Sequence, residues 1–100
     1  MLNSKQRSKL KALAQTEEPI GQIGKGGISD NMVKSLADAL EARELIKLSV
    51  LNNSEDEPIW LARELEGKLG AECVAVIGKK IILYKKSLKK AKEKKGIKLD

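Results

Sequence analysis

The chain has 100 residues, of which 41% are hydrophobic and 34% charged, with a net charge of +6, and these values predict one small soluble domain. Because the sequence contains no histidine, it offers no imidazole base, no Ser-His-Asp triad and no histidine-bound metal. Its single cysteine, Cys73, excludes an internal disulfide, and no apolar run reaches the roughly 18 residues of a membrane span. The first residues become polar too early for a signal peptide, so we expect a cytoplasmic protein without a cofactor.

Charge is distributed unevenly along the chain. Residues 1–11 carry four basic side chains and no acidic one, and residues 12–78 carry six basic and twelve acidic side chains. Residues 79–100 carry ten lysines and two acidic residues. Basic ends around an acidic middle favour a polyanionic partner such as nucleic acid. Charge alone also leaves open an acidic membrane surface, or lysines that serve solubility only.

The first segment, from Ser4 to about Thr16, has the pattern of a helix. Ser4 is the expected N-cap, and apolar residues recur at helical spacing between two basic flanks. These flanks are candidate nucleic-acid contacts and consist of Lys5, Arg7, Lys9 and Lys11. Pro19 ends the helix, since the residue before a proline avoids the helical conformation.

Residues 19–23 are expected to form a short strand near a sheet edge, because they include a proline and a glycine. A glycine cluster, Gly24–Gly27, follows this strand. Ser29 is the expected N-cap of a helix that ends near Arg43. Residues 44–51 then alternate apolar and polar side chains, as in a strand with one buried face.

The second half of the chain predicts a helix and a hairpin. Asp56 and Pro58 mark the start of the helix, and Gly70 marks its end. Two strands are expected at Glu72–Ile77 and Ile81–Lys85, with a short turn between them.

This order of helix, strand, helix, strand, helix, strand, strand predicts an α/β fold. The strand-helix-strand units favour parallel pairing and the final hairpin is antiparallel, so we expect a mixed four-stranded sheet. The expected architecture is a small two-layer sandwich over residues 1–86. Residues 87–100 are expected to be a frayed helix or a disordered lysine-rich tail.

The glycine cluster lies between an expected strand and an expected helix. It is not a Walker A loop, because Gly26 follows Lys25 where a hydroxyl is needed, and it does not fit the dinucleotide fingerprint GxGxxG. It does fit G-x-x-G, the loop that clamps a nucleic-acid backbone in KH modules. Gly24 and Gly27 let a phosphate approach, the helix start offers free N–H groups and Lys25 adds charge. Alone, the motif is a weak signal, and a tight structural turn is its default interpretation.

The stretch Gln22–Asn31 around this loop resembles the YhbY family, the bacterial single-domain form of the CRM (chloroplast RNA splicing and ribosome maturation) domain. Other segments agree in order and spacing, so the resemblance covers about residues 2–86. These segments are Lys5-Gln6-Arg7 with Leu10, Pro19-Ile20, Ala39–Lys47, Val76–Lys79 and Leu83–Lys85. Many relatives end in Leu-Tyr-Arg where this chain has Leu-Tyr-Lys, a change that weakens any bidentate phosphate contact there.

The resemblance implies RNA binding without catalysis. Bacterial members of the family associate with precursors of the large ribosomal subunit, and plant relatives bind group II introns. Their fold is similar to the C-terminal domain of bacterial translation initiation factor three. On this basis the RNA-binding residues are Gly24, Lys25, Gly26 and Gly27, with Lys5 and Arg7 on the first helix and Lys9 and Lys11 as local additions.

The remaining conspicuous residues have simpler interpretations. Trp60 is expected to cover part of the core, and Tyr84 is expected to pack in the last strand, so few aromatics remain to stack on bases. Cys73 is expected to be a small apolar core residue. The acidic residues 55–57 lack the spacing of a calcium loop, so we expect a solvated loop there and no metal site.

Two hypotheses of function follow. The first is a non-catalytic, monomeric RNA-binding protein that associates with ribosomal RNA in large-subunit precursors and assists ribosome assembly. The alternative is a protein–protein adapter whose basic ends are incidental. An enzyme is the least favoured, because nucleophile, base and cofactor motifs are all missing from the sequence.

Overall fold

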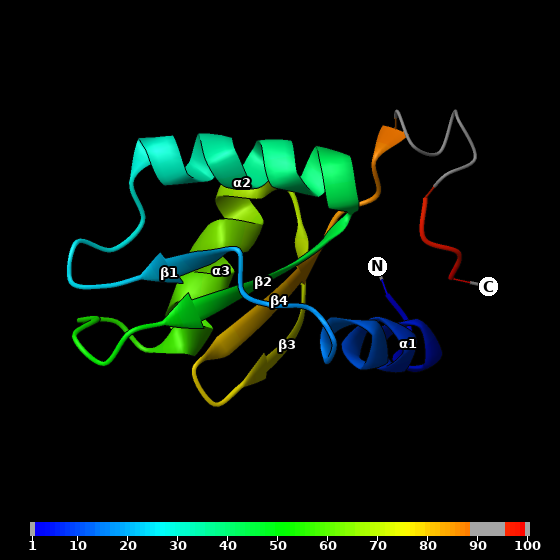
Figure 1. Cartoon of the computed structure of the whole chain (residues 1–100), viewed down its shortest axis with the longest axis horizontal. Helices are drawn as coiled ribbons and strands as arrows, with labels where there is room; N and C mark the ends of the chain where they lie inside the picture. The colour runs from blue at the N-terminus through cyan, green and yellow to red at the C-terminus, as the bar shows by residue number, and fades with distance from the viewer. Residues whose placement is uncertain (1, 89–95, 100) are drawn as a thin grey trace.

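A computed structural model of the chain describes residues 2–88 and 96–99 (Figure 1). Within these residues, seven helices and strands follow one another in the predicted order, which confirms the predicted α/β class. In chain order they are α1 (Ser4–Ala14), β1 (Gly21–Ile23), α2 (Asp30–Arg43), β2 (Leu45–Val50), α3 (Pro58–Leu69), β3 (Glu72–Ile77) and β4 (Lys80–Tyr84).

The four strands form one mixed sheet in the order β1-β2-β4-β3. β1 runs parallel to β2, and the β2–β4 and β3–β4 pairs are antiparallel. β1 lies at an edge as predicted, and β3 forms the opposite edge. The β3–β4 turn places Gly78 at φ 57°, a conformation that favours glycine, and Ile77 pairs with Lys80 across it.

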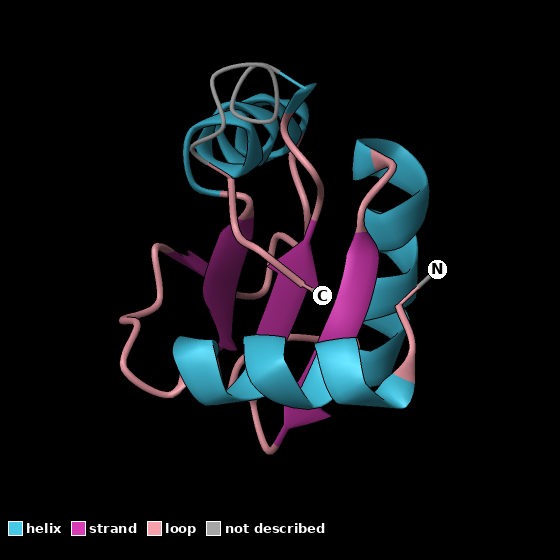
Figure 2. Cartoon of the chain, turned by 90° about the vertical axis from the view of Figure 1, so that its right-hand side faces the viewer, coloured by secondary structure: helices cyan, strands magenta, loops and turns pink. Residues whose placement is uncertain are grey.

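Helices cover both faces of the sheet, so the architecture has three layers where we expected two (Figure 2). On one face, α2 and α3 bury a large core against alternate residues of β2 and β4, among them Leu48 and Leu83. On the other face, Leu10 and Ala14 of α1 pack against the intervening residues, among them Ile82 and Tyr84. The reason lies in β4, whose four apolar residues in a row bury both faces of that strand.

The helix boundaries confirm most of the local signals. Ser29 caps α2 by accepting a hydrogen bond from the Met32 backbone, and Gly70 ends α3 with φ 63°. The N-cap predicted for α1 was wrong by one residue: Asn3 is the N-cap, because its side chain and that of Gln6 bond each other's backbone N–H in a capping box. The helix also ends at Ala14, two residues before the predicted Thr16.

The last described residues return to the domain. Ile97 and Leu99 pack against the cluster that α1 builds on the sheet, which includes Leu45. For residues 96–99, therefore, the expectation of a frayed or disordered tail was wrong, since their apolar side chains cover a core face. The same expectation for residues 89–95 lies outside the described residues, and the division of the chain after residue 86 stays a prediction.

Candidate nucleic-acid interface

The glycine loop joins β1 to α2 and projects from one end of the molecule (Figure 1). The Gly27 N–H donates to the Gly24 carbonyl over 3.0 Å, which closes a turn with Lys25 and Gly26 at its exposed tip. The turn leads directly to Ser29 and the first turn of α2, where backbone N–H groups and the helix dipole favour an anion. The loop therefore combines a lysine, small residues and a helix start at one exposed place.

The glycines of the loop differ in what they require. A Cβ on Gly24 would lie 3.1 Å from Asn53 Oδ1 and 3.3 Å from Leu51 Cδ1, so this glycine permits close packing against the β2–α3 loop. Gly27 has φ 70°, which side chains rarely adopt. Gly26 has neither constraint, because a Cβ there would meet nothing within 4 Å. The first and last positions of G-x-x-G are thus structural needs, and the tip is open to substitution.

The basic residues of α1 lie far from this loop. Figure 1 shows α1 at one end of the long axis and the β1–α2 loop at the other end. Lys5, Lys9 and Lys11 are exposed on α1, and the Lys9 ammonium group donates to the Lys98 carbonyl. The structure therefore does not join the two predicted sets of RNA-binding residues into one contiguous site.

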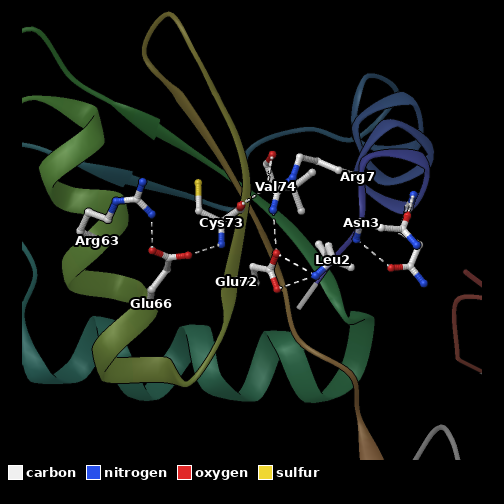
Figure 3. A network of polar contacts seen from close by, with 9 residues as sticks. Leu2, Asn3, Arg7, Arg63, Glu66, Glu72, Cys73 and Val74 are labelled. Atoms are coloured by element: carbon white, nitrogen blue, oxygen red, sulfur yellow. Dashed lines mark hydrogen bonds and ion pairs between the residues drawn. The ribbon is translucent and has the colours of Figure 1, made fainter.

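Arg7 differs from its basic neighbours, because its guanidinium group bonds the edge of the sheet (Figure 3). Nη1 donates to the carbonyls of Cys73 and Val74 over 2.6 and 2.9 Å, and Nη2 donates to the Glu72 carboxylate over 2.7 Å. The Glu72 carboxylate also accepts the Leu2 backbone N–H. These contacts supply partners to an edge strand at its bulge and dock α1. The role of Arg7 in RNA binding stays a prediction, but three of its five N–H donors are occupied.

Glu66 of α3 occupies the same strand edge from the other side (Figure 3). Its carboxylate accepts the Cys73 backbone N–H over 2.8 Å and an Arg63 N–H over 2.8 Å. Burial would raise the pKa of Glu66, but these two hydrogen bonds and the positive charge of Arg63 outweigh burial and lower it. Burial raises the pKa of the neighbouring Cys73 thiol, so this side chain stays protonated at neutral pH.

The aromatic residues have opposite environments. Tyr84 is buried in β4 as predicted, and Cys73 packs partly buried against the larger core. The prediction for Trp60 was wrong, since 67% of this residue is exposed. Leu61 and Leu65 occupy the core-facing side of α3, and the helical spacing turns Trp60 away from them.

Three residues near the glycine loop were not among the predicted RNA-binding residues: Asn52, Asn53 and Lys79. The two asparagines follow β2, Lys79 is at the β3–β4 turn, and all three are exposed. Lys79 bonds Asn52, and Asn53 lies against Gly24 of the glycine loop. The sequence offered two signals for Lys79, its place after a turn glycine and its place in the resembling segment Val76–Lys79, and neither identifies its neighbours in space.

Residues 2–88 and 96–99 contain neither a candidate metal site nor a candidate membrane-spanning helix. No group of three or more Cys, Asp or Glu side chains there could hold a metal ion. No helix in that part of the chain is long and apolar enough to cross a membrane.

The fold and the loop define a class: a small α/β module with a mixed sheet that presents a G-x-x-G turn at the start of a helix. The model of the CRS1 / YhbY (CRM) domain matches residues 2–85, and the chain belongs to this family.

Similar proteins agree with this assignment. The chain is 48% identical over 99 residues to Probable RNA-binding protein YqeI of Bacillus subtilis (strain 168), covering 99% of each chain. It is 28% identical over 86 residues to an RNA-binding protein of Haemophilus influenzae, covering 86% of this chain and 87% of that one. The solution structure of the hypothetical protein SAV1595 from Staphylococcus aureus, a candidate RNA binding protein, superposes with a TM-score of 0.74. That protein is 48% identical, and the match covers 87% of this chain and 91% of the other.

Proposed function

We propose that this protein binds RNA through the Gly24–Gly27 turn. The observation that carries the proposal is the position of this turn, which holds an exposed lysine at the N-terminal end of α2. Relatives that the chain matches over nearly their whole length are named RNA-binding proteins, which supports the same conclusion. As in the first of our hypotheses, the RNA is ribosomal RNA in large-subunit precursors, and the protein assists assembly in the cytoplasm as a non-catalytic monomer.

The proposed mechanism is contact with the sugar-phosphate backbone. A phosphate at the turn would meet the Lys25 ammonium group and the backbone N–H groups that begin α2. Of the two aromatic residues, Tyr84 is buried and Trp60 lies on α3, so the turn itself offers no stacking platform. Recognition then depends on backbone shape and charge, and binding weakens strongly with added salt.

The exposed lysines of α1 are a second, separate contact in this proposal. Lys5, Lys9 and Lys11 lie at the other end of the molecule, so they would touch an RNA segment distant from the one at the turn (Figure 1). Such contacts add affinity without adding sequence preference.

One observation favours the adapter hypothesis. Trp60 is 67% exposed and its neighbour Ile59 is 40% exposed, and large exposed apolar side chains mark protein contacts. An adapter would retain its partner when the glycine loop is changed, and it would lose that partner when Trp60 is replaced.

A double substitution of the turn tests the proposal. Lys25→Asp with Gly26→Asp places two negative charges at the tip and keeps Gly24 and Gly27. Because Gly26 has open space and no positive φ, the melting temperature should stay close to that of the parent. Affinity for precursor large-subunit ribosomal RNA should fall at least tenfold, because attraction becomes repulsion at close range.

The control makes the same change of charge elsewhere. Lys86→Asp with Gly67→Asp alters two exposed positions outside the turn, and Gly67 also has no atom within 4 Å of a Cβ. If both variants lose the same RNA affinity, the loss comes from the change in net charge, and this outcome would contradict a site at the turn. A folded turn variant that binds like the parent would contradict it outright. Co-sedimentation of each variant with large-subunit precursors tests the ribosomal part separately.

A further inference from the structure

Three loops meet at the end of the molecule that carries the glycine turn. The Leu51 N–H donates to the Ile23 carbonyl over 2.8 Å, which joins the chain after β2 to the start of the glycine loop. A Cβ on Gly24 would lie 3.1 Å from Asn53 Oδ1, so the β2–α3 loop packs directly on the glycine loop.

The β3–β4 turn is bound to the same β2–α3 loop. The Val50 N–H donates to the Lys79 carbonyl over 2.7 Å. The Lys79 ammonium group donates to Asn52 Oδ1 over 2.5 Å. A lysine that lies more than fifty residues from the glycine loop in the sequence is thereby linked to it through Asn52 and Asn53 of the β2–α3 loop.

We propose that Lys79, oriented by Asn52, is a second cation of the RNA site, so that the RNA backbone passes from the Gly24–Gly27 turn across Asn53 to Lys79. This inference rests on the proposed function, and it extends the site to a strand hairpin. A G-x-x-G loop in KH modules clamps about four backbone nucleotides, so a bound strand extends beyond the turn.

The chemistry of Lys79 suits this role. Its hydrogen-bond partner Asn52 is a neutral amide, so the bond orients the ammonium group without pairing it with a carboxylate. Arg7 and Arg63, by contrast, donate to carboxylates that offset their charges. A cation that is already oriented loses less side-chain entropy when it meets a phosphate.

Acidic residues limit the course of the backbone. Glu55, Asp56 and Glu57 line a cavity together with Asn52 and Lys79. A polyanion avoids these carboxylates, so the backbone crosses on the side of Lys79 that faces the glycine loop. The acidic residues thus define one border of the site, and the turn defines the other.

The neighbouring Lys80 provides a matched control for Lys79. Its ammonium group donates to the Ser49 hydroxyl over 2.9 Å within the sheet, so it is held on β2 and not on the β2–α3 loop. Lys79→Ala and Lys80→Ala remove the same charge from adjacent positions of the full chain.

The experiment is titration of precursor large-subunit ribosomal RNA at several salt concentrations, with thermal melting of each sample. Lys79→Ala should weaken binding about three- to tenfold and lower the salt slope by about one unit, as a lost phosphate contact does. Lys80→Ala should stay within about twofold. Lys25→Ala with Lys79→Ala should lower the slope by about two units, and Asn52→Ala should weaken binding while Lys79 keeps its charge.

The outcomes separate this inference from the proposed function. Equal binding of the Lys79→Ala and Lys80→Ala proteins would overturn the second cation, even where Lys25→Ala still weakens binding. Unchanged binding by the folded Lys25→Asp, Gly26→Asp variant would instead overturn the site at the turn. If Lys79→Ala weakens RNA binding and Lys25→Ala does not, the RNA contacts the β3–β4 hairpin and not the turn.

Discussion

The Glu44 carboxylate lies 2.6 Å from the Ile97 backbone nitrogen and accepts its hydrogen bond, which joins the end of α2 to the last described residues. Its other oxygen accepts the Ser87 N–H over 2.7 Å. Glu44 is 1% exposed and has φ 65°, an unfavourable conformation for this residue type. The two hydrogen bonds offset the burial of its carboxylate and fix the C-terminal segment over the sheet.

Gly96 is the first position where this relationship can be tested. A Cβ there would lie 2.8 Å from Glu44 Oε1, so Gly96→Ala must displace the buried carboxylate or the C-terminal segment. We expect a loss of about 1–3 kcal/mol in the free energy of unfolding, measured by urea denaturation. Gly67→Ala is the control, because Gly67 lies inside α3 with open space around a Cβ, and this change should stabilise by about 0.5–1 kcal/mol. A stabilising Gly96→Ala change would show that residues 96–99 are not held on Glu44.

Arg7 should stabilise the fold through its hydrogen bonds more than through its positive charge. Arg7→Ala removes the donors for two carbonyls and for the Glu72 carboxylate, and should lower the free energy of unfolding by about 1–2 kcal/mol. Arg7→Lys keeps the charge but loses the fork geometry, so it should recover only part of that loss. Lys5→Ala, on the exposed side of the same helix, should change stability by less than about 0.5 kcal/mol. If Arg7→Ala melts like Lys5→Ala, the contacts of Arg7 with the strand edge contribute nothing.

The lowered pKa of Glu66 makes its contribution depend on pH. Its folded pKa lies below the ordinary value of 4.5, so the folded state favours the ionised carboxylate. The contribution is complete above the unfolded pKa and is lost as the pH falls through the lowered folded value. The difference in unfolding free energy between the parent and Glu66→Gln should therefore be larger at pH 7 than at pH 3. Glu64→Gln, which alters an exposed pair with Lys68, should show a small difference throughout. A difference for Glu66→Gln that grows toward acid pH would mean that folding raises the pKa of this carboxyl group.

Tryptophan fluorescence should measure the exposure of Trp60 directly, because Trp60 is the only tryptophan in the chain. Its fluorescence should be quenched by acrylamide almost as efficiently in the folded protein as in the unfolded one. Trp60→Ala should change the free energy of unfolding by less than about 0.5 kcal/mol, whereas Leu61→Ala, at the adjacent buried position, should lower it by about 2–5 kcal/mol. Strong protection from the quencher would show that another surface covers this side chain.

Local signals in the sequence predicted the order and approximate bounds of all seven elements. Ser29 and Gly70 end their helices through interactions within a few residues, and apolar spacing is equally local. The glycine turn was likewise visible, because its geometry depends on Gly24 and Gly27 themselves. The predicted number of layers, two, was wrong, because local patterns do not show on which face of the sheet α1 packs.

By itself, then, the sequence determined the α/β class, the element order and the candidate turn, since each depends on neighbouring residues. Only the tertiary structure decided which residues of different elements contact one another. Arg7 meets Glu72, Lys79 meets Asn52, and Glu44 receives the backbone of Ile97. The pairs are separated by between 27 and 65 residues along the chain, so no local spacing encodes them. They exist because sheet pairing and burial bring those backbones together, and polar groups left at the contacts then take the nearest available partners.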